Sequence, residues 1–261
     1  MIRALLLACA ALCLAPAAQA QQPPIPVLTY HRFDRLVSHS GTVITTPKFL
    51  RQMEWLAAHR IAVVPLHQAV AALRGGPAVG PAVVLTADDG WKTVYTDMFP
   101  IITRLHLPMT LFLNPPMIGR GGAYLTWPMI DEMVKSGLVD IQAHTQHHPN
   151  FNTERAALDA GRYAGFIAHE IGDSRADLAA HVAPPIDQLA WPFGIHDATL
   201  EAAAKAAGYS YAFALGSRPM TEADPDFALP RLQIYDTDTE TSFAWIATGH
   251  PRAQPKRKPA T

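Results

Sequence analysis

The stretch AVVLTADDGW, residues 82–91, indicates the fold and raises the first chemical question. Its first six residues are apolar or β-branched, which predicts a short buried strand. Two acidic residues, Asp88 and Asp89, follow that strand directly, and neighbouring carboxylates repel each other. A fold that keeps both of them at the end of a buried strand is expected to use each for a separate task.

Seven further short runs resemble this strand and alternate with helical patterns. They are VLTY (27–30), IAVV (61–64), MTLFL (109–113), VDIQA (139–143), QLAW (188–191), YAFAL (211–215) and RLQIY (231–235). Strands that alternate with helices form parallel sheets, and roughly eight of them in one domain predict an α/β fold, a single distorted (β/α) barrel of seven or eight parallel strands. An open doubly wound sheet is the alternative, although no Gly-rich dinucleotide loop follows the first strand.

The first twenty residues differ from this domain in composition. They carry one charge, Arg3, then an apolar stretch and the small-residue sequence Ala18-Gln19-Ala20, which is the pattern of a cleaved signal peptide. We therefore expect residues 1–20 to be removed and the protein to be exported, to a periplasm or to the medium. Both cysteines, Cys9 and Cys13, fall inside this segment, and a lipoprotein signal that ends at Cys9 is the alternative.

Charge and hydropathy exclude several classes of partner for the domain predicted over residues 21–250. The chain has 21 basic and 22 acidic residues, and this balance predicts neither nucleic acid nor an anionic membrane as a partner. After the predicted signal peptide, no stretch approaches the ~18 apolar residues of a membrane span. Residues 251–261 contain four basic residues among prolines, which predicts a disordered tail, with a tether to an acidic polymer as the alternative.

Polar residues follow several of the predicted strands. In barrels of this kind the loops at the carboxyl ends of the strands carry the site, so residues far apart in sequence are expected to converge on one face. The first strand is followed by His31, the third by Asp88 and Asp89, the fifth by His144 and His148, and the sixth by Pro192 and Phe193, while Arg231 stands at the edge of the last.

The segment AHTQHHP, residues 143–149, suggests a metal site. Its His144 and His148 are four residues apart, a spacing that puts both imidazoles on one side of a helical turn. One carboxylate of the aspartate pair completes a three-ligand face, and the other is then free to act as a general base toward a metal-activated water. Such a ligand set suits Zn²⁺, with Co²⁺, Ni²⁺ and Fe²⁺ as alternatives, and an inert exposed histidine loop is the competing interpretation.

These motifs resemble those of the polysaccharide deacetylases of carbohydrate esterase family 4, the NodB homology domain. The first motif of that family ends in Asp-Asp-Gly, which Asp88-Asp89-Gly90 matches. The second is His-Ser/Thr-x-x-His, which the segment from His144 to His148 matches about 55 residues later. The resemblance implies that Asp88 is the catalytic base and that Asp89, His144 and His148 bind the metal ion.

The chain also departs from the usual family pattern. Ala87 stands where the family has phenylalanine, and the third motif, LAWPFG (189–194), lacks its initial arginine. An exported subgroup, similar to the deacetylases of biofilm poly-N-acetylglucosamine, shares this motif ending and an early Tyr-His, matched by Tyr30-His31. The resemblance implies His31 as the general acid and Arg231 as the partner of Asp88. A structural histidine and a surface ion pair are the respective alternatives.

The implied activity is metal-dependent removal of N-acetyl groups from N-acetylglucosamine residues of a polysaccharide. Asp88 would take a proton from the attacking water, the backbone N–H of Phe193 would help to hold the oxyanion, and His31 would protonate the leaving amine. Trp191, Phe193 and Trp127 are expected to bind the sugar, with a core position as the alternative for each. Two other functions stay open: an O-acetyl esterase acting on xylan or peptidoglycan, and a non-catalytic glycan-binding protein.

Overall fold

The structure of the chain is a computed structural model that describes residues 22–36, 40–183 and 185–252. The predicted signal peptide, residues 1–20, lies outside the described residues, and so does most of the predicted basic tail. Within the described ranges, no helix combines the length and the apolar character needed to cross a membrane.

Seven parallel strands close into a ring, which confirms the predicted barrel. The ring follows the order β1 (Val27–Tyr30), β10 (Leu229–Gln233), β9 (Tyr211–Gly216), β8 (Gln188–Ala190), β7 (Val139–Ala143), β6 (Met109–Leu113) and β5 (Ala82–Asp88). It closes because β5 pairs with β1 over four residues. An eighth strand, β4 (Ala62–Val63), pairs in parallel with the start of β5. An open doubly wound sheet has no such closing pair, so that alternative is wrong.

A small second sheet was not anticipated from the sequence. Its two parallel strands are β2 (Arg32–Asp34) and β3 (Val43–Thr45). Strand β2 has the sequence Arg-Phe-Asp, in which two charged residues flank one apolar residue, and β3 has only the three residues Val-Ile-Thr, so neither contains an apolar run of the usual strand length. They follow β1 directly and lead the chain from the barrel into the first helix.

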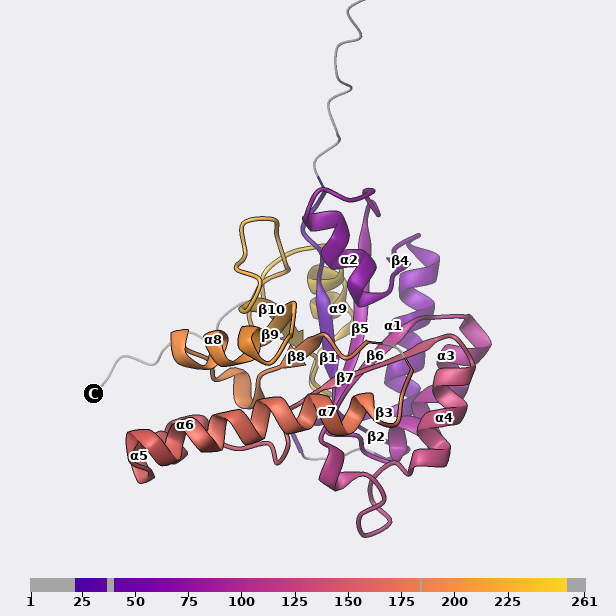
Figure 1. Cartoon of the computed structure of the whole chain (residues 1–261). Coiled ribbons are helices and arrows are strands. Elements are labelled where there is room, and N and C mark those ends of the chain that lie inside the picture. The colour runs from indigo at the N-terminus through magenta and orange to yellow at the C-terminus, as the bar shows by residue number, and fades with distance from the viewer. Residues whose placement is uncertain (1–21, 37–39, 184, 253–261) are drawn as a thin grey trace, which may run out of the picture.

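Helices surround the barrel (Figure 1). In chain order they are α1 (Thr46–Ala58), α2 (Leu66–Leu73), η1 (Val94–Met98), α3 (Phe99–Leu105), η2 (Pro115–Met117), α4 (Trp127–Lys135), the short η4 (Pro192–Gly194), α8 (Ala198–Ala206) and α9 (Glu240–Ala247). A long helical run between β7 and β8 crosses the lower part of Figure 1. It consists of α5 (Phe151–Ala157), α6 (Ala160–Ala168), the π-helical η3 (His169–Asp173) and α7 (Ser174–Ala179).

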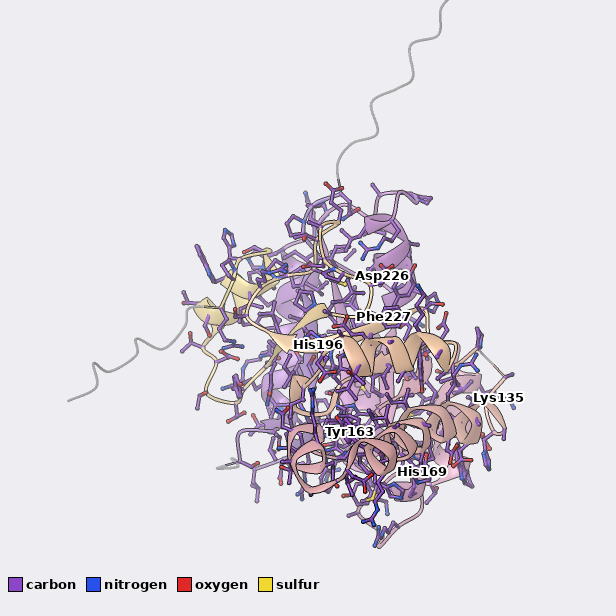
Figure 2. All side chains as sticks on the ribbon, turned by 60° about the vertical axis from the view of Figure 1, so that its left-hand side comes forward. Lys135, Tyr163, His169, His196, Asp226 and Phe227 are labelled. Carbon is purple, nitrogen blue, oxygen red and sulfur yellow. The ribbon has the colours of Figure 1, made fainter. Side chains whose placement is uncertain are left out.

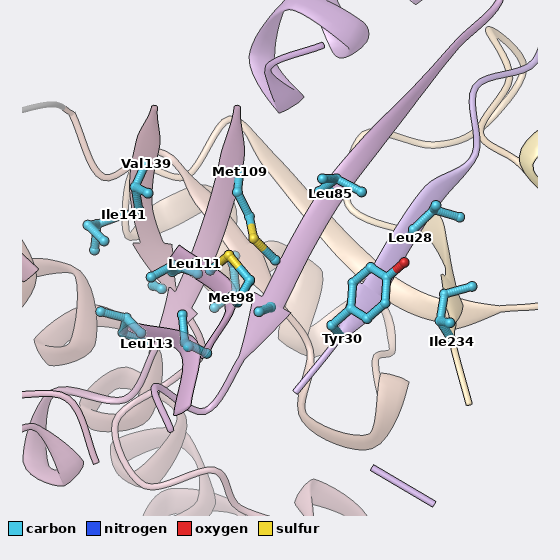
Figure 3. Close-up of a cluster of buried hydrophobic side chains, with 14 of the residues drawn as sticks. Leu28, Tyr30, Leu85, Met98, Met109, Leu111, Leu113, Val139, Ile141 and Ile234 are labelled. Carbon is cyan, nitrogen blue, oxygen red and sulfur yellow. The ribbon is translucent and has the colours of Figure 1, made fainter. Parts of the chain in front are cut away.

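The strands separate two apolar cores. Successive side chains on a strand point to opposite faces, so Leu85 packs toward the helices while Val84 packs inside the barrel. Figure 3 shows the helix-facing core, to which β1, β5, β6 and β7 each contribute side chains. The same alternation turns Thr86 and Asp88 of β5 toward the interior with Val84. Asp88 is therefore directed into the barrel, where only 2% of its surface is exposed.

The folded domain extends further toward the C-terminus than expected. Arg252 donates hydrogen bonds to both carboxylate oxygens of Asp238, at 2.7 and 2.9 Å, and its guanidinium lies 5.0 Å from the centre of the Tyr235 ring. Residues 251 and 252 were predicted to belong to a disordered tail, and for Arg252 that prediction is wrong. A buried acidic partner on the domain holds this arginine in place.

Candidate active site

Three side chains with metal-ligand chemistry meet at the carboxyl end of the barrel. Nε2 of His144 lies 3.6 Å from Oδ1 of Asp89, and Nε2 of His148 lies 3.8 Å from the same oxygen. These distances are too long for hydrogen bonds. They are close to the roughly 3.4 Å that separates two ligand atoms each about 2.1 Å from one tetrahedral ion. Two imidazoles and one carboxylate therefore fit a divalent metal ion.

The backbone around these residues adopts a conformation that side chains disfavour. Positive φ angles occur at Asp89 (70°), Thr145 (64°), His148 (56°) and Phe193 (56°). In the described part of the chain only two other non-glycine residues share this feature, Arg60 and His106. Left-handed conformations of this kind collect at functional sites, where the surrounding fold holds them against their intrinsic cost. Asp89 lies in the loop after β5, Thr145 and His148 lie in the loop after β7, and Phe193 lies in the turn after β8, so the candidate ligands come from two loops.

The tautomer of His144 suits a metal ligand. Its Nδ1 lies 2.8 Å from the carbonyl oxygen of Ala190 on the neighbouring strand β8. A carbonyl can only accept, so Nδ1 carries the proton and Nε2 presents its lone pair toward Asp89. Burial lowers the pKa of His144 to about 4, which keeps the ring neutral near pH 7. A neutral imidazole is the form that binds metal ions.

Trp91 supports Asp89 and was missed in the sequence. Its indole N–H donates to Oδ2 of Asp89 at 3.1 Å, which leaves Oδ1 facing the two histidines. The indole stacks on Tyr124 with a centroid distance of 4.7 Å, and the guanidinium of Arg32 lies 5.2 Å from its centre. The signal was present, because Trp91 directly follows the Asp-Asp-Gly motif. Hydrogen bonds to a ligating carboxylate fix its orientation.

Asn114 supports the histidine loop and was also missed. It follows strand β6, is 2% exposed, and donates from its side-chain amide to the carbonyl oxygens of His144 and Thr145. A polar residue at the carboxyl end of a predicted strand is the signal that pointed to the other site residues. The same rule applied to the strand at residues 109–113 would have found Asn114.

Asp88 forms a buried ion pair with Arg231. Both of its oxygens accept hydrogen bonds from the guanidinium at 2.7 Å, and the Arg231 side chain is fully buried. Burial alone would raise the pKa of Asp88, but the guanidinium, with smaller contributions from His144 and His31, holds it well below its usual range. Asp88 is thus ionised. The alternative of a surface ion pair is wrong.

The strand register explains how these two residues meet. Thr29 of β1 pairs with Thr86 of β5 on one side and with Gln233 of β10 on the other. Arg231 therefore lies in the middle of β10, two residues before Gln233. The prediction that it stands at the edge of the strand is wrong. Its side chain extends toward the carboxyl end of the barrel. There Nη1 lies 3.4 Å from Oγ1 of Thr86 and donates a hydrogen bond to Asp88.

His31 completes the constellation. Its Nε2 lies 4.0 Å from Oδ2 of Asp88, and 13% of its side chain is exposed. The same oxygen of Asp88 lies 3.8 Å from Nε2 of His144. One carboxylate oxygen thus faces both the histidine predicted to be the acid and a candidate metal ligand. His31, Asp88 and His144 thus lie side by side at the carboxyl end of the barrel.

The three aromatic residues predicted to bind sugar have different surroundings. Phe193 is 58% exposed, and its ring packs edge-on against His148 at 4.6 Å, so it lies at the site with a free face. Trp191 is fully buried and donates its indole N–H to the carbonyl of Phe227. Trp127 stacks on His181 with the ring centres 3.9 Å apart. The prediction for Trp191 is wrong, because core packing covers both faces of its ring.

Comparison with known proteins gives a family match over the part of the chain that carries the site. The sequence profile of the polysaccharide deacetylase family matches residues 75–212, which is more than half of the chain. The matched region includes Asp88, Asp89, His144 and His148. It leaves out His31 and Arg231, the two residues that lie before and after it.

Individual relatives cover more of the chain. The poly-β-1,6-N-acetyl-D-glucosamine N-deacetylase of Staphylococcus epidermidis is 26% identical over 233 residues, which are 82% of this chain and 80% of the relative. The structure of IcaB from Ammonifex degensii is 26% identical, covers 87% of this chain and 97% of that one, and has a TM-score of 0.72. The fold is shared with the Streptococcus pyogenes deacetylase PplD in complex with acetate, which is 20% identical. That match covers 88% of this chain and 100% of the other, with a TM-score of 0.77.

Proposed function

Since the chain belongs to the polysaccharide deacetylase family, we propose that it removes N-acetyl groups from N-acetylglucosamine residues of a polysaccharide in a metal-dependent hydrolysis. One observation carries the proposal. The ionised Asp88 presents Oδ2 3.8 Å from Nε2 of His144 and 4.0 Å from Nε2 of His31. The metal would be held by Asp89, His144 and His148, and zinc is the first ion to test.

The side chains divide the reaction between them. A divalent ion bound at the three ligands would polarise the acetyl carbonyl and lower the pKa of a water molecule. Asp88, kept ionised and oriented by Arg231, accepts the proton of the attacking water. His31 donates a proton to the departing nitrogen, which an amide requires because an amine anion is a very poor leaving group. The backbone N–H of Phe193 is the candidate donor to the oxyanion.

For the substrate we propose a β-1,6-linked N-acetylglucosamine polymer. Support comes from the name of the Staphylococcus epidermidis relative, which is a poly-β-1,6-N-acetyl-D-glucosamine N-deacetylase. Within the site, the exposed ring of Phe193 beside His148 offers an apolar face of the kind on which sugar rings pack.

The test is acetate release from a short β-1,6-linked N-acetylglucosamine oligomer with Zn²⁺ or Co²⁺ added. We expect release by the native chain, and a loss of about 10²- to 10⁴-fold in kcat for Asp88→Asn, which keeps the shape of the side chain but removes the base. Asp224→Asn is the matched control, because Asp224 is also a buried carboxylate paired with an arginine, Arg218, outside the site. It should keep activity.

Other outcomes would favour the alternatives. Acetate released from acetylated xylan or peptidoglycan esters but not from the amide would indicate an O-acetyl esterase. Glycan binding without release from any of these substrates, in a metal-loaded and folded protein, would indicate a non-catalytic binding protein. Full activity in Asp88→Asn would remove Asp88 as the base while leaving the deacetylase assignment in place.

We also propose that the enzyme acts outside the cytoplasm. The proposal depends on the signal-peptide pattern of residues 1–20, which lies outside the described part of the structure. Mass spectrometry of the protein recovered from a secreting host should find an N-terminus near Gln21. An intact N-terminus in a cytoplasmic fraction would contradict it.

A further inference from the structure

A second pair of histidines lies beside the active site without belonging to it. His147 stands in the loop between the two histidine ligands, and His169 begins η3 on the long helical run, on the outside of the molecule (Figure 2). Their side chains are 53% and 49% exposed, and their ring centres are 5.5 Å apart. The ring centres of the pair in the active site, His144 and His148, are 4.7 Å apart.

In each of the two imidazoles, Nδ1 is hydrogen-bonded to a different carboxylate. Nδ1 of His147 lies 2.8 Å from Oε1 of Glu170, and Nδ1 of His169 lies 2.6 Å from Oδ2 of Asp173. A carboxylate can only accept, so each Nδ1 carries a proton and each neutral ring has its lone pair on Nε2. Carboxylates placed behind histidines in this way orient the rings and raise their basicity in metal sites.

The charge of the cluster also favours a cation. Glu170 is only 1% exposed, and its second oxygen accepts from the backbone N–H of His147 at 2.8 Å. A buried carboxylate is costly unless a positive charge compensates it. Asp173 adds a second negative charge beside two rings that are neutral when unprotonated. A divalent cation on the two Nε2 atoms would balance both carboxylates.

The spacing agrees with one ion shared by both rings. Two imidazoles whose Nε2 atoms each lie about 2.1 Å from a tetrahedral ion have ring centres about 5 Å apart. The observed distance between His147 and His169 is 5.5 Å. A potential ligand atom of His147 lies within 4.8 Å of one of His169.

We propose that His147 and His169 bind a second divalent metal ion of the class that prefers imidazole, such as Zn²⁺, Ni²⁺ or Cu²⁺. Water completes its coordination, because both side chains are half exposed. The ion is held more weakly than one at Asp89, His144 and His148, since it has fewer protein ligands. It would join the loop that carries His148 to η3, so its binding stabilises the loop that presents an active-site ligand.

Counting bound ions tests the proposal. The full chain, free of any histidine tag and stripped of metal, is titrated with Zn²⁺ by calorimetry, and bound zinc is counted by equilibrium dialysis. We expect two ions on the native chain, the second at least tenfold weaker, and one ion on His169→Ala. His196→Ala is the matched control, because Nδ1 of His196 also lies 2.8 Å from a carboxylate, that of Glu201, but its ring stacks with Trp191 and not with a second histidine. It should still bind two.

A further variant separates this site from the proposed active site. Asp89→Ala should lose the tighter ion and keep the weaker one, and addition of His169→Ala should then remove the weaker ion as well. Two ions on His169→Ala, or no weaker ion on the native chain, would overturn the second site. If Asp89→Ala still binds two ions while His169→Ala binds one, the proposed metal site at Asp89 is wrong and the second site is supported.

Discussion

At the scale of single residues, Arg231 decides the chemistry of Asp88. A carboxylate with 2% of its surface exposed would ordinarily tend to bind a proton, because burial penalises its charge. Two hydrogen bonds of 2.7 Å to the guanidinium reverse that tendency. Since the pKa of Asp88 is lower in the folded chain than in the unfolded chain, the ion pair stabilises the fold fully above about pH 4, and this stabilisation is lost as the pH falls further.

Replacement of Arg231 should therefore change both the stability and the pH profile. In Arg231→Met, Asp88 is left buried without its cation, so its pKa rises and the acidic limb of kcat/KM moves to higher pH. Removal of one partner from a buried pair costs about 3–5 kcal/mol of unfolding free energy. Urea denaturation and the pH dependence of acetate release measure the two effects.

Arg231→Lys is the conservative control for that experiment. Lysine keeps the positive charge but cannot form two parallel hydrogen bonds to one carboxylate. Its acidic limb should lie between those of the native chain and Arg231→Met. An acidic limb that stays in place in both variants, in folded protein, would show that Arg231 does not control the protonation of Asp88.

At the scale of elements, the turn after β8 shows how a loop is held at the site. Phe193 and Gly194 both adopt positive φ, at 56° and 72°. A Cβ atom added at Gly194 would lie 2.8 Å from the backbone nitrogen of Leu215 on β9, closer than contacts allow. The turn thus rests directly on the neighbouring strand, and this close approach sets the position of the Phe193 ring against His148.

Gly194→Ala should accordingly damage both the fold and the activity. The added methyl group has to displace the turn from β9, which costs about 1–3 kcal/mol beyond the strain of a left-handed alanine. Gly121→Ala is the matched control, because Gly121 also has a positive φ, 61°, but a Cβ atom there meets nothing within 4 Å. Unfolding free energies and kcat/KM measured for both variants should differ clearly. Equal losses would mean that the contact with Leu215 has no effect.

At the scale of the whole molecule, stability comes from the closed sheet and its two apolar cores. Figure 3 shows the outer core between strands and helices, and α2 packs with the inner core through residues such as Leu66 and Val70. The proposed metal ligands lie in loops at one end of this structure. The barrel is therefore expected to fold without its ion, unlike small domains whose fold depends on a metal.

Removal of metal should separate activity from folding. Chelation is expected to abolish acetate release while the far-UV circular dichroism stays unchanged. An ion present at 100 times its Kd adds about 2.7 kcal/mol, which corresponds to a fall of roughly 5–11 °C in Tm for a chain of this length when it is removed. Readdition of Zn²⁺ should restore both the rate of acetate release and the Tm. Loss of the helical signal on chelation would contradict this account of the fold.

The sequence by itself determined the features that depend on local order. Strands β1, β6 and β7 have the bounds that the apolar runs predicted, because a short run of apolar and β-branched residues between polar ones is a property of the local sequence. The pair Asp88 and Asp89 identified the end of a buried strand. His144 and His148 do lie close together, but the helical turn predicted from their spacing is wrong, because residues 144–150 form an irregular loop with left-handed Thr145 and His148. Strand β2 was beyond this kind of prediction, because two of its three residues, Arg32 and Asp34, are charged and no apolar run marks it.

Only the tertiary structure decided which distant groups touch and which side chains are covered. Arg231 and Asp88 are 143 residues apart, and their ion pair depends on closure of the barrel and on the register of β1 against two strands. Trp191 was predicted to bind sugar from the sequence, but core packing buries it completely in the folded chain. The physical reason is the same in both cases. Hydrogen bonding between strands and close packing are set by all the neighbours in space, and a local pattern contains only the neighbours in sequence.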